Sequence, residues 1–186
     1  MALGRAQPSS ALSLLDLANG ASFDSGDGTI SFSGFSAEVK GGKANKDLST
    51  YDVIVLDDGF LIDLSNATKG NLKMSYTATG DPALNGVSLM LAGDPGKGKA
   101  KKEAKIGNKK AAKLKAGVGA TAFGAFGDAS VVSITEKVQI KAAGLTSVGN
   151  AFSHQGTVST FSVVPEPTSL LLAPLAALAL RRRRRR

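Results

Sequence analysis

Hydrophobic and polar residues alternate with a period of two along much of the chain. The alternation is clearest over residues 30–33, 72–78 and 87–91, where large apolar residues are separated mainly by Ser, Thr and Lys. A period of two is typical of β-strands that bury one face. We therefore predict a strand in each of these three ranges.

Two further apolar runs predict a hairpin. Residues 51–56 and 60–64 flank the sequence Asp57-Asp58-Gly59, which favours a tight turn between antiparallel strands. Only residues 13–19 favour a short helix, with Gly20 as its C-cap.

The remaining elements complete an all-β pattern. Strands are also predicted over 130–141 and 156–164, and Gly80-Asp81-Pro82 is one of several glycine-containing turn signals. Seven or eight short strands with such turns predict an antiparallel β-sandwich, jelly-roll or immunoglobulin-like in the broad sense. We expect this domain to cover residues 12–162.

Composition limits the chemistry that the domain can perform. The chain has no cysteine, which excludes disulfides and thiolate metal sites, and its single histidine is His154. A zinc site or a Ser-His-Asp triad would depend on that one side chain, which we interpret as a solvated residue of a loop or strand edge. We expect no catalytic residues, no enzymatic activity, no metal and no cofactor.

Two glycine-rich motifs have weak functional interpretations. Gly93 to Lys99 matches the G-x-x-x-x-G-K pattern of phosphate-binding loops, but Ala100 stands where a magnesium-binding hydroxyl is needed. Asp24 and Asp27 lie in a turn that suits calcium, although Asp-Gly pairs are also common turn formers. Asn66-Ala67-Thr68 has the acceptor pattern for N-glycosylation. We favour the structural interpretation of the first two motifs.

The net charge of +8 is unevenly distributed. Residues 97–115 contain nine lysines and one glutamate, and residues 165–186 contain six arginines and one glutamate, so the rest of the chain is mildly acidic. We interpret 97–115 either as a solvated insertion between two strands, partly helical or disordered, or as a contact for a polyanion. The candidate contacts are Lys97, Lys99, Lys101, Lys102, Lys105, Lys109, Lys110, Lys113 and Lys115.

The polyanion on this hypothesis is an acidic polysaccharide, extracellular DNA or anionic lipid. No aromatic residues are interleaved with the lysines to stack on bases, so we expect no specific nucleic-acid recognition. Binding through lysines alone should be nonspecific and should weaken steeply with salt.

The chain ends in three segments whose order is informative. Val164, Pro165, Glu166 and Pro167 disfavour a helix, residues 170–180 are almost entirely Leu and Ala, and the last residues are Arg181, Arg182, Arg183, Arg184, Arg185 and Arg186. The apolar stretch spans about 16–20 Å as a helix, less than the roughly 30 Å of a bilayer core, so snorkelling arginines and local thinning would have to close the difference. The arginines favour a cytoplasmic C-terminus.

This tail resembles the PEP-CTERM sorting signal of bacterial surface proteins. The resemblance covers residues 164–186, within a sorting segment that we assign to 163–186, and implies an exported protein that is transiently anchored in the inner membrane through residues 169–186. It also implies processing by an exosortase near Pro165–Pro167 and delivery to the cell surface, outer envelope or extracellular matrix, in association with exopolysaccharide or biofilm. The alternative interpretation is a basic tail that contacts nucleic acid.

The N-terminus only partly agrees with export. Residues 1–11 include Ser9-Ser10-Ala11, which fits a signal-peptide cleavage site, but Met1 to Gln7 contains no hydrophobic region. We interpret residues 1–11 as the remnant of a signal peptide or as an N-terminal tail, with the true start upstream of Met1. The alternative is that Met1 is the start and that export fails or depends on the C-terminal tail alone.

Overall fold

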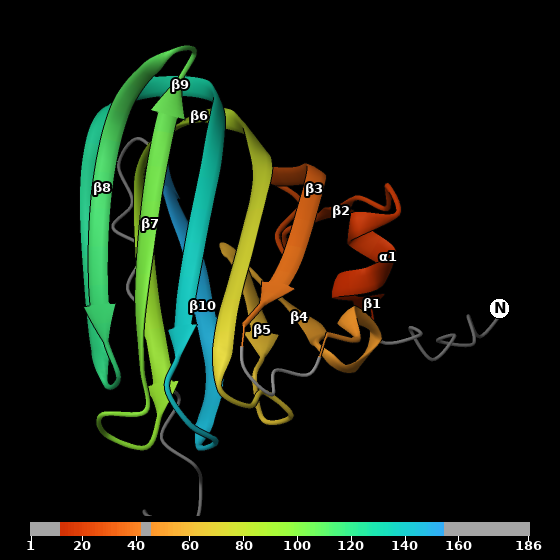
Figure 1. Cartoon of the computed structure of the whole chain (residues 1–186). Coiled ribbons are helices and arrows are strands. Elements are labelled where there is room, and N and C mark those ends of the chain that lie inside the picture. The colour runs from red at the N-terminus through yellow and green to blue at the C-terminus, as the bar shows by residue number, and fades with distance from the viewer. Residues whose placement is uncertain (1–11, 42–45, 155–186) are drawn as a thin grey trace, which may run out of the picture.

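The described part of the protein is an antiparallel β-sheet fold with one short α-helix (Figure 1). The computed structural model describes residues 12–41 and 46–154. The all-β prediction is confirmed. The predicted strand 156–164, residues 1–11 and the sorting segment 163–186 lie outside the described residues.

The strands differ greatly in length. The short elements are β1 (Leu12–Ser13), α1 (Leu14–Ala18), β2 (Phe23–Asp24), the 3-10 helix η1 (Leu48–Thr50), β4 (Asp52–Leu56) and β5 (Gly59–Asp63). The longer strands are β3 (Ile30–Lys40), β6 (Gly70–Gly93), β7 (Gly98–Ile106), β8 (Lys109–Gly117), β9 (Ala120–Ile140) and β10 (Leu145–His154).

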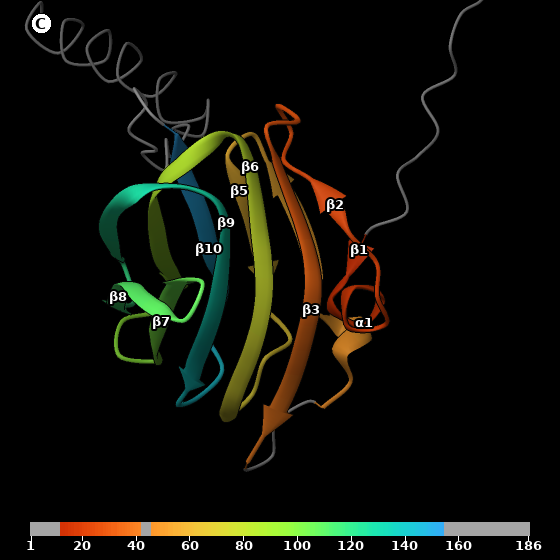
Figure 2. The ribbon, with the colours of Figure 1, turned by 90° about the horizontal axis from the view of Figure 1, so that it is seen from above.

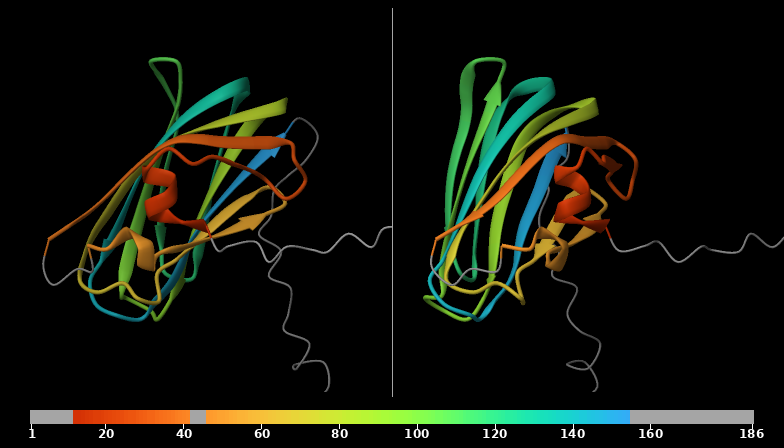
Figure 3. Two further views of the ribbon diagram at one scale, coloured as in Figure 1. Left: turned by 90° about the vertical axis from the view of Figure 1, so that its right-hand side faces the viewer. Right: turned by 45° about the vertical axis from the view of Figure 1, so that its right-hand side comes forward.

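The two longest strands connect the two halves of the sheet. The first part of β6, residues 71–79, pairs with β3 and with residues 131–139 of β9. Its second part, residues 84–91, pairs with β10 and with the beginning of β9. In Figure 1, β8, β7, β9, β6 and β3 form the near layer, and β10, β5 and β4 lie behind it. The fold is therefore sandwich-like, with two strands passing from one layer to the other (Figures 2 and 3).

The prediction of two separate strands over 72–78 and 87–91 is wrong, because both ranges belong to the single strand β6. Gly80-Asp81-Pro82 has the composition of a turn, but the strand continues through it with a shift of register against β9 between Thr79 and Leu84. A Cβ on Gly80 would lie 2.6 Å from the Leu84 side chain, so the absence of a side chain permits the bend. The local signal marks a bend in the strand instead of its end.

The predicted helix and hairpin are confirmed. Ser13 caps α1 and forms a reciprocal capping box with Asp16, and Gly20 follows the C-cap residue with a φ of +102°. Strands β4 and β5 pair up to Leu56 and Gly59, which leaves Asp57 and Asp58 as the hairpin loop.

Aromatic rings from both layers form the centre of the core. The Phe32 ring on β3 lies 5.1 Å from Phe60 on β5 and 5.6 Å from Phe152 on β10, measured between centroids. Tyr76 on β6 stacks on Phe35 at 5.1 Å. The two contacts of Phe32 join the layers directly, and all three pairs lie at distances where rings attract.

Candidate functional site

The lysine-rich segment is part of the sheet. Residues 97–115 form most of a β-hairpin in which β7 and β8 pair with each other, and β7 also pairs with β9. The prediction of a partly helical or disordered insertion is therefore wrong. Lysine alternates with alanine in these strands, and alanine is too weakly hydrophobic to give a clear strand pattern in the sequence.

The hairpin separates its small and charged residues onto opposite faces. The buried side chains include Ala100, Ala104, Ala112 and Ala116. Lysines occupy the opposite, solvent-facing side of the strands. The exposed lysines of the whole hairpin are Lys99, Lys101, Lys105, Lys109, Lys110, Lys113 and Lys115, and Lys97, just before β7, is half-buried. Seven of the nine candidate residues are thus exposed to solvent.

The pairing register places four exposed lysines side by side across four strands. Lys73 on β6 is opposite Lys137 on β9, Lys137 is opposite Lys101 on β7, and Lys101 is opposite Lys115 on β8. We call these four residues the lysine row. Adjacent strands are about 4.8 Å apart, so the row crosses the sheet nearly perpendicular to the strands. Like charges placed directly opposite one another destabilise a sheet, and a bound anion would relieve that repulsion.

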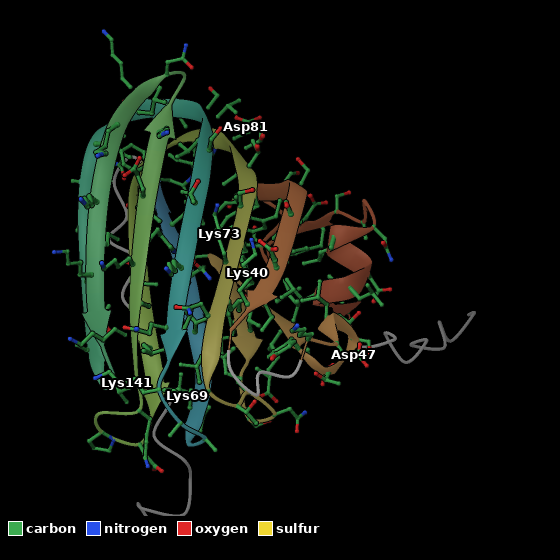
Figure 4. The ribbon with its side chains drawn as sticks, viewed as in Figure 1. Lys40, Asp47, Lys69, Lys73, Asp81 and Lys141 are labelled. Atoms are coloured by element: carbon green, nitrogen blue, oxygen red, sulfur yellow. The ribbon has the colours of Figure 1, made fainter. Side chains whose placement is uncertain are left out.

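Lys73 and Lys137 were missed by the sequence analysis of the basic segment. Each occupies an ordinary polar position in an alternating strand, and only the register of β6, β9 and β7 brings them beside Lys101. Figure 4 shows Lys73 and Lys40 on this layer, with Lys69 and Lys141 at its lower end. A surface depression at that end is lined in part by Lys69, Asn71, Gln139 and Lys141.

One acidic side chain lies within the hairpin. The Glu103 carboxylate is 3.2 Å from the Lys110 Nζ and 3.6 Å from the Lys105 Nζ. The hydrogen bond from Lys110 lowers the pKa of Glu103, so this carboxylate remains charged and partly neutralises the lysines on the outer face of β7, the face that also carries Lys101.

Lys102 is not a surface contact. Its side chain is turned into the core, where it is 1% exposed and its Nζ donates to the Ser88 carbonyl at 2.8 Å. The Nζ is 3.8 Å from the Glu136 Oε2 and 5.8 Å from the centre of the Phe152 ring. The prediction that all nine lysines share one surface role is therefore wrong for this residue, because Lys102 occupies an inward position of β7.

Lys102 and Glu136 belong to a buried polar cluster with Asn150 and Tyr76. The Tyr76 hydroxyl donates to the Asn150 Oδ1 at 3.1 Å, and Asn150 and Glu136 are both fully buried. Burial lowers the pKa of Lys102 to about 8, although the Glu136 carboxylate acts in the opposite direction. Burial raises the pKa of Glu136 to about 7, against the opposing effects of Lys102 and Asn150. Desolvation thus brings the proton affinities of the two groups close together.

The phosphate-loop interpretation is not supported by the local structure. Gly93 ends β6 and Gly98 begins β7, so the motif connects two strands that each pair with β9 and not with each other. A phosphate-binding loop of this type needs a following helix whose N-terminal amides face the anion. Lys99 instead lies exposed on the strand.

In the turn that was considered for calcium, the Asp27 carboxylate is already engaged in hydrogen bonds with neighbouring residues. Asp27 accepts from the Ser25 hydroxyl at 2.6 Å and from the backbone N and hydroxyl of Thr29. Burial raises the pKa of Asp27, but these hydrogen bonds outweigh it and lower the pKa overall. Among the described residues no group of three or more His, Cys, Asp or Glu is arranged to hold a metal ion.

His154 is neither a loop residue nor solvated. It ends β10 and is 8% exposed, with its Nδ1 2.9 Å from the Pro82 carbonyl and its Nε2 3.0 Å from the Thr29 hydroxyl. Strand β10 was missed because it pairs with both β5 and β6 and is almost continuously buried, which removes the alternation of apolar and polar residues. The contacts of His154 hold the end of this strand against the bend of β6.

The chain matches no family model, no curated protein and no solved structure. Within residues 12–41 and 46–154, no helix has the length and apolar character that a membrane span requires.

Proposed function

We propose that this is an exported bacterial surface or extracellular-matrix protein whose domain is a non-enzymatic β-sandwich, jelly-roll or immunoglobulin-like in the broad sense. The observation that carries the proposal is the order of Val164-Pro165-Glu166-Pro167, the apolar stretch 170–180 and the terminal arginines. On this proposal residues 169–186 hold the protein in the inner membrane until an exosortase cuts near Pro165–Pro167. The facing sheet layers and their shared aromatic core support the sandwich assignment.

We expect processing to be visible in the mass of the native protein. Protein recovered from the cells and medium of the source bacterium should lack the segment after Pro165–Pro167, because the signal is removed once the domain has crossed the membrane. Intact-mass spectrometry gives the position of the cut and the mass of any attached glycan. A variant with Pro165 and Pro167 replaced by Ala should retain the tail. Full-length, cytoplasmic wild-type protein would contradict the proposal.

We propose as a second function that the domain binds an acidic polysaccharide through its lysine-rich layer. An alternative explanation of the lysines on β8 is that they prevent aggregation. Strand β8 is the last in the sheet order, and lysine on an exposed edge strand opposes pairing with other chains. This explanation does not apply to Lys73 and Lys137, which lie on strands that are paired on both sides. A continuous row of cations on the sheet is better suited to a linear anion.

Retention on immobilised alginate tests this second function. Retention should fall steeply between about 50 mM and about 500 mM NaCl, since exposed charges are screened over distances that shrink from roughly 13 Å to roughly 4 Å. Salt-independent retention would contradict an electrostatic mechanism. Stronger binding to DNA or to anionic vesicles than to alginate would assign the layer to a different polyanion.

A further inference from the structure

Three polar side chains from three strands meet in the core between the two layers. Lys102 comes from β7, Glu136 from β9 and Asn150 from β10, and each is at most 1% exposed. Lys102 and Glu136 are direct partners in the pairing of β7 with β9. Asn150 lies on the other layer, with its Oδ1 bonded to the Tyr76 hydroxyl and its amide near enough to Glu136 to lower the pKa of that carboxyl.

Several polar atoms of this cluster lack hydrogen-bond partners. Neither carboxylate oxygen of Glu136 nor the Nδ2 of Asn150 has a hydrogen bond of ordinary geometry to the described residues. Buried ions and amides without such partners cost free energy, and replacing a buried ion pair by apolar residues is often stabilising. A purely structural role therefore leaves the identity of these three residues unexplained.

The same arrangement suits a reaction between an amine and a carboxamide. We propose that, after folding, the Lys102 Nζ forms an amide bond with the side-chain Cγ of Asn150, with release of ammonia, and that Glu136 carries the protons. The proposal concerns the domain itself and does not depend on export or on polyanion binding.

Each group has a defined task in this reaction. The lysine must be neutral to act as a nucleophile, and burial has already lowered its pKa to about 8 while raising that of Glu136 to about 7. A proton can therefore pass from the ammonium to the carboxylate far more readily than in water. The Tyr76 hydroxyl donates to the Oδ1 of Asn150, which draws electron density from Cγ and stabilises negative charge as it develops on that oxygen.

The atoms balance without any other reactant. The Lys102 ammonium first gives one proton to the Glu136 carboxylate, and the Nζ lone pair then forms the new bond to Cγ. Glu136 gives that proton to Nδ2 and takes up the second proton from Nζ, so Glu136 ends the reaction protonated. The bond between Cγ and Nδ2 then breaks and ammonia leaves. No oxidant is required, and the chain has no cysteine with which to form a disulfide. The product removes the buried ammonium charge and the Nδ2 donor that lacks a partner.

The mass of the folded, purified full chain tests the proposal. The wild type should be lighter than its sequence mass by about 17 Da, the mass of one ammonia molecule. Trypsin should leave Lys102 uncut and yield one branched peptide that contains both Lys102 and Asn150. Lys102→Met and Asn150→Ala should each restore the full mass, and Glu136→Gln should prevent the bond or slow its formation at least tenfold.

Two results would overturn the proposal. One is a wild type that unfolds cooperatively yet has its full sequence mass, a measurement that does not depend on whether any variant folds. The other is a mass loss of the same size confined to a linear peptide containing Asn85-Gly86, a pair that can lose ammonia by cyclising to a succinimide.

Discussion

Replacing the lysine row by glutamine should weaken binding to alginate by roughly 30-fold at low salt. The change is Lys73, Lys101, Lys115 and Lys137→Gln, and all four side chains are exposed, so the fold should be unaffected. An exposed ion pair contributes about 0.5 kcal/mol, so removing four ion pairs with the polysaccharide together should cost about 2 kcal/mol of binding free energy. Isothermal titration calorimetry or retention on immobilised alginate measures the difference. The residual binding should also depend less steeply on salt.

A matched control variant distinguishes the effect of the lysine row from the effect of the total charge. Lys46, Lys69, Lys109 and Lys141→Gln removes the same number of charges from positions at strand ends or outside the strands. This variant should lose much less affinity, because it leaves the four lysines of the row in place. Equal losses in the two variants would show that only the total charge matters, and the row would then have no special part in binding.

Relative to a folded chain in which Lys102 keeps its ammonium, replacing Lys102 by methionine should destabilise the domain by about 3–5 kcal/mol at pH 8, because the Glu136 carboxyl is left buried without a cation. Burial raises the pKa of Glu136 to about 7 even though the Lys102 charge lowers it, so without Lys102 this carboxyl takes up a proton more readily as the pH falls. The penalty should therefore be smaller at pH 5 than at pH 8. Urea denaturation at both pH values gives the free energy of unfolding.

The double variant Lys102→Met with Glu136→Leu provides the control. It removes both charges and fills the space with apolar atoms, so it should recover most of the stability that the single variant loses at pH 8. Both variants lack the lysine amine, which makes the comparison independent of a bond between Lys102 and Asn150. A double variant no more stable than the single one would show that the buried carboxylate is not the source of the loss.

Local signals were sufficient for some elements of this fold. The short helix that ends before Gly20 and the hairpin loop Asp57-Asp58 are each determined by neighbouring residues, and the structure agrees with the prediction in both cases. The alternation in β3 and in the two parts of β6 likewise reflects one buried face. All of these predictions rest on interactions between residues close in sequence.

The candidate site could not be predicted in the same way. The lysine row exists only because β6, β9, β7 and β8 pair in one particular register. Lys101 and Lys102 are adjacent residues of the same type, and only the side of the strand decides which one is buried. Asn150 meets Glu136 through packing between layers. Register and layer packing depend on the whole chain, so composition alone indicates a basic segment and nothing more.

The central position of β10 has a mechanical consequence. Hydrogen bonds hold this strand on both sides, to β5 and to β6, and His154 is its last described residue. Tension applied through the residues that follow His154 would pull β10 along its own axis. Its ladders would be loaded in shear, so many hydrogen bonds would have to break together instead of opening one at a time from an edge. A domain attached to a surface by its C-terminus would thus resist extension at the point where the attachment acts.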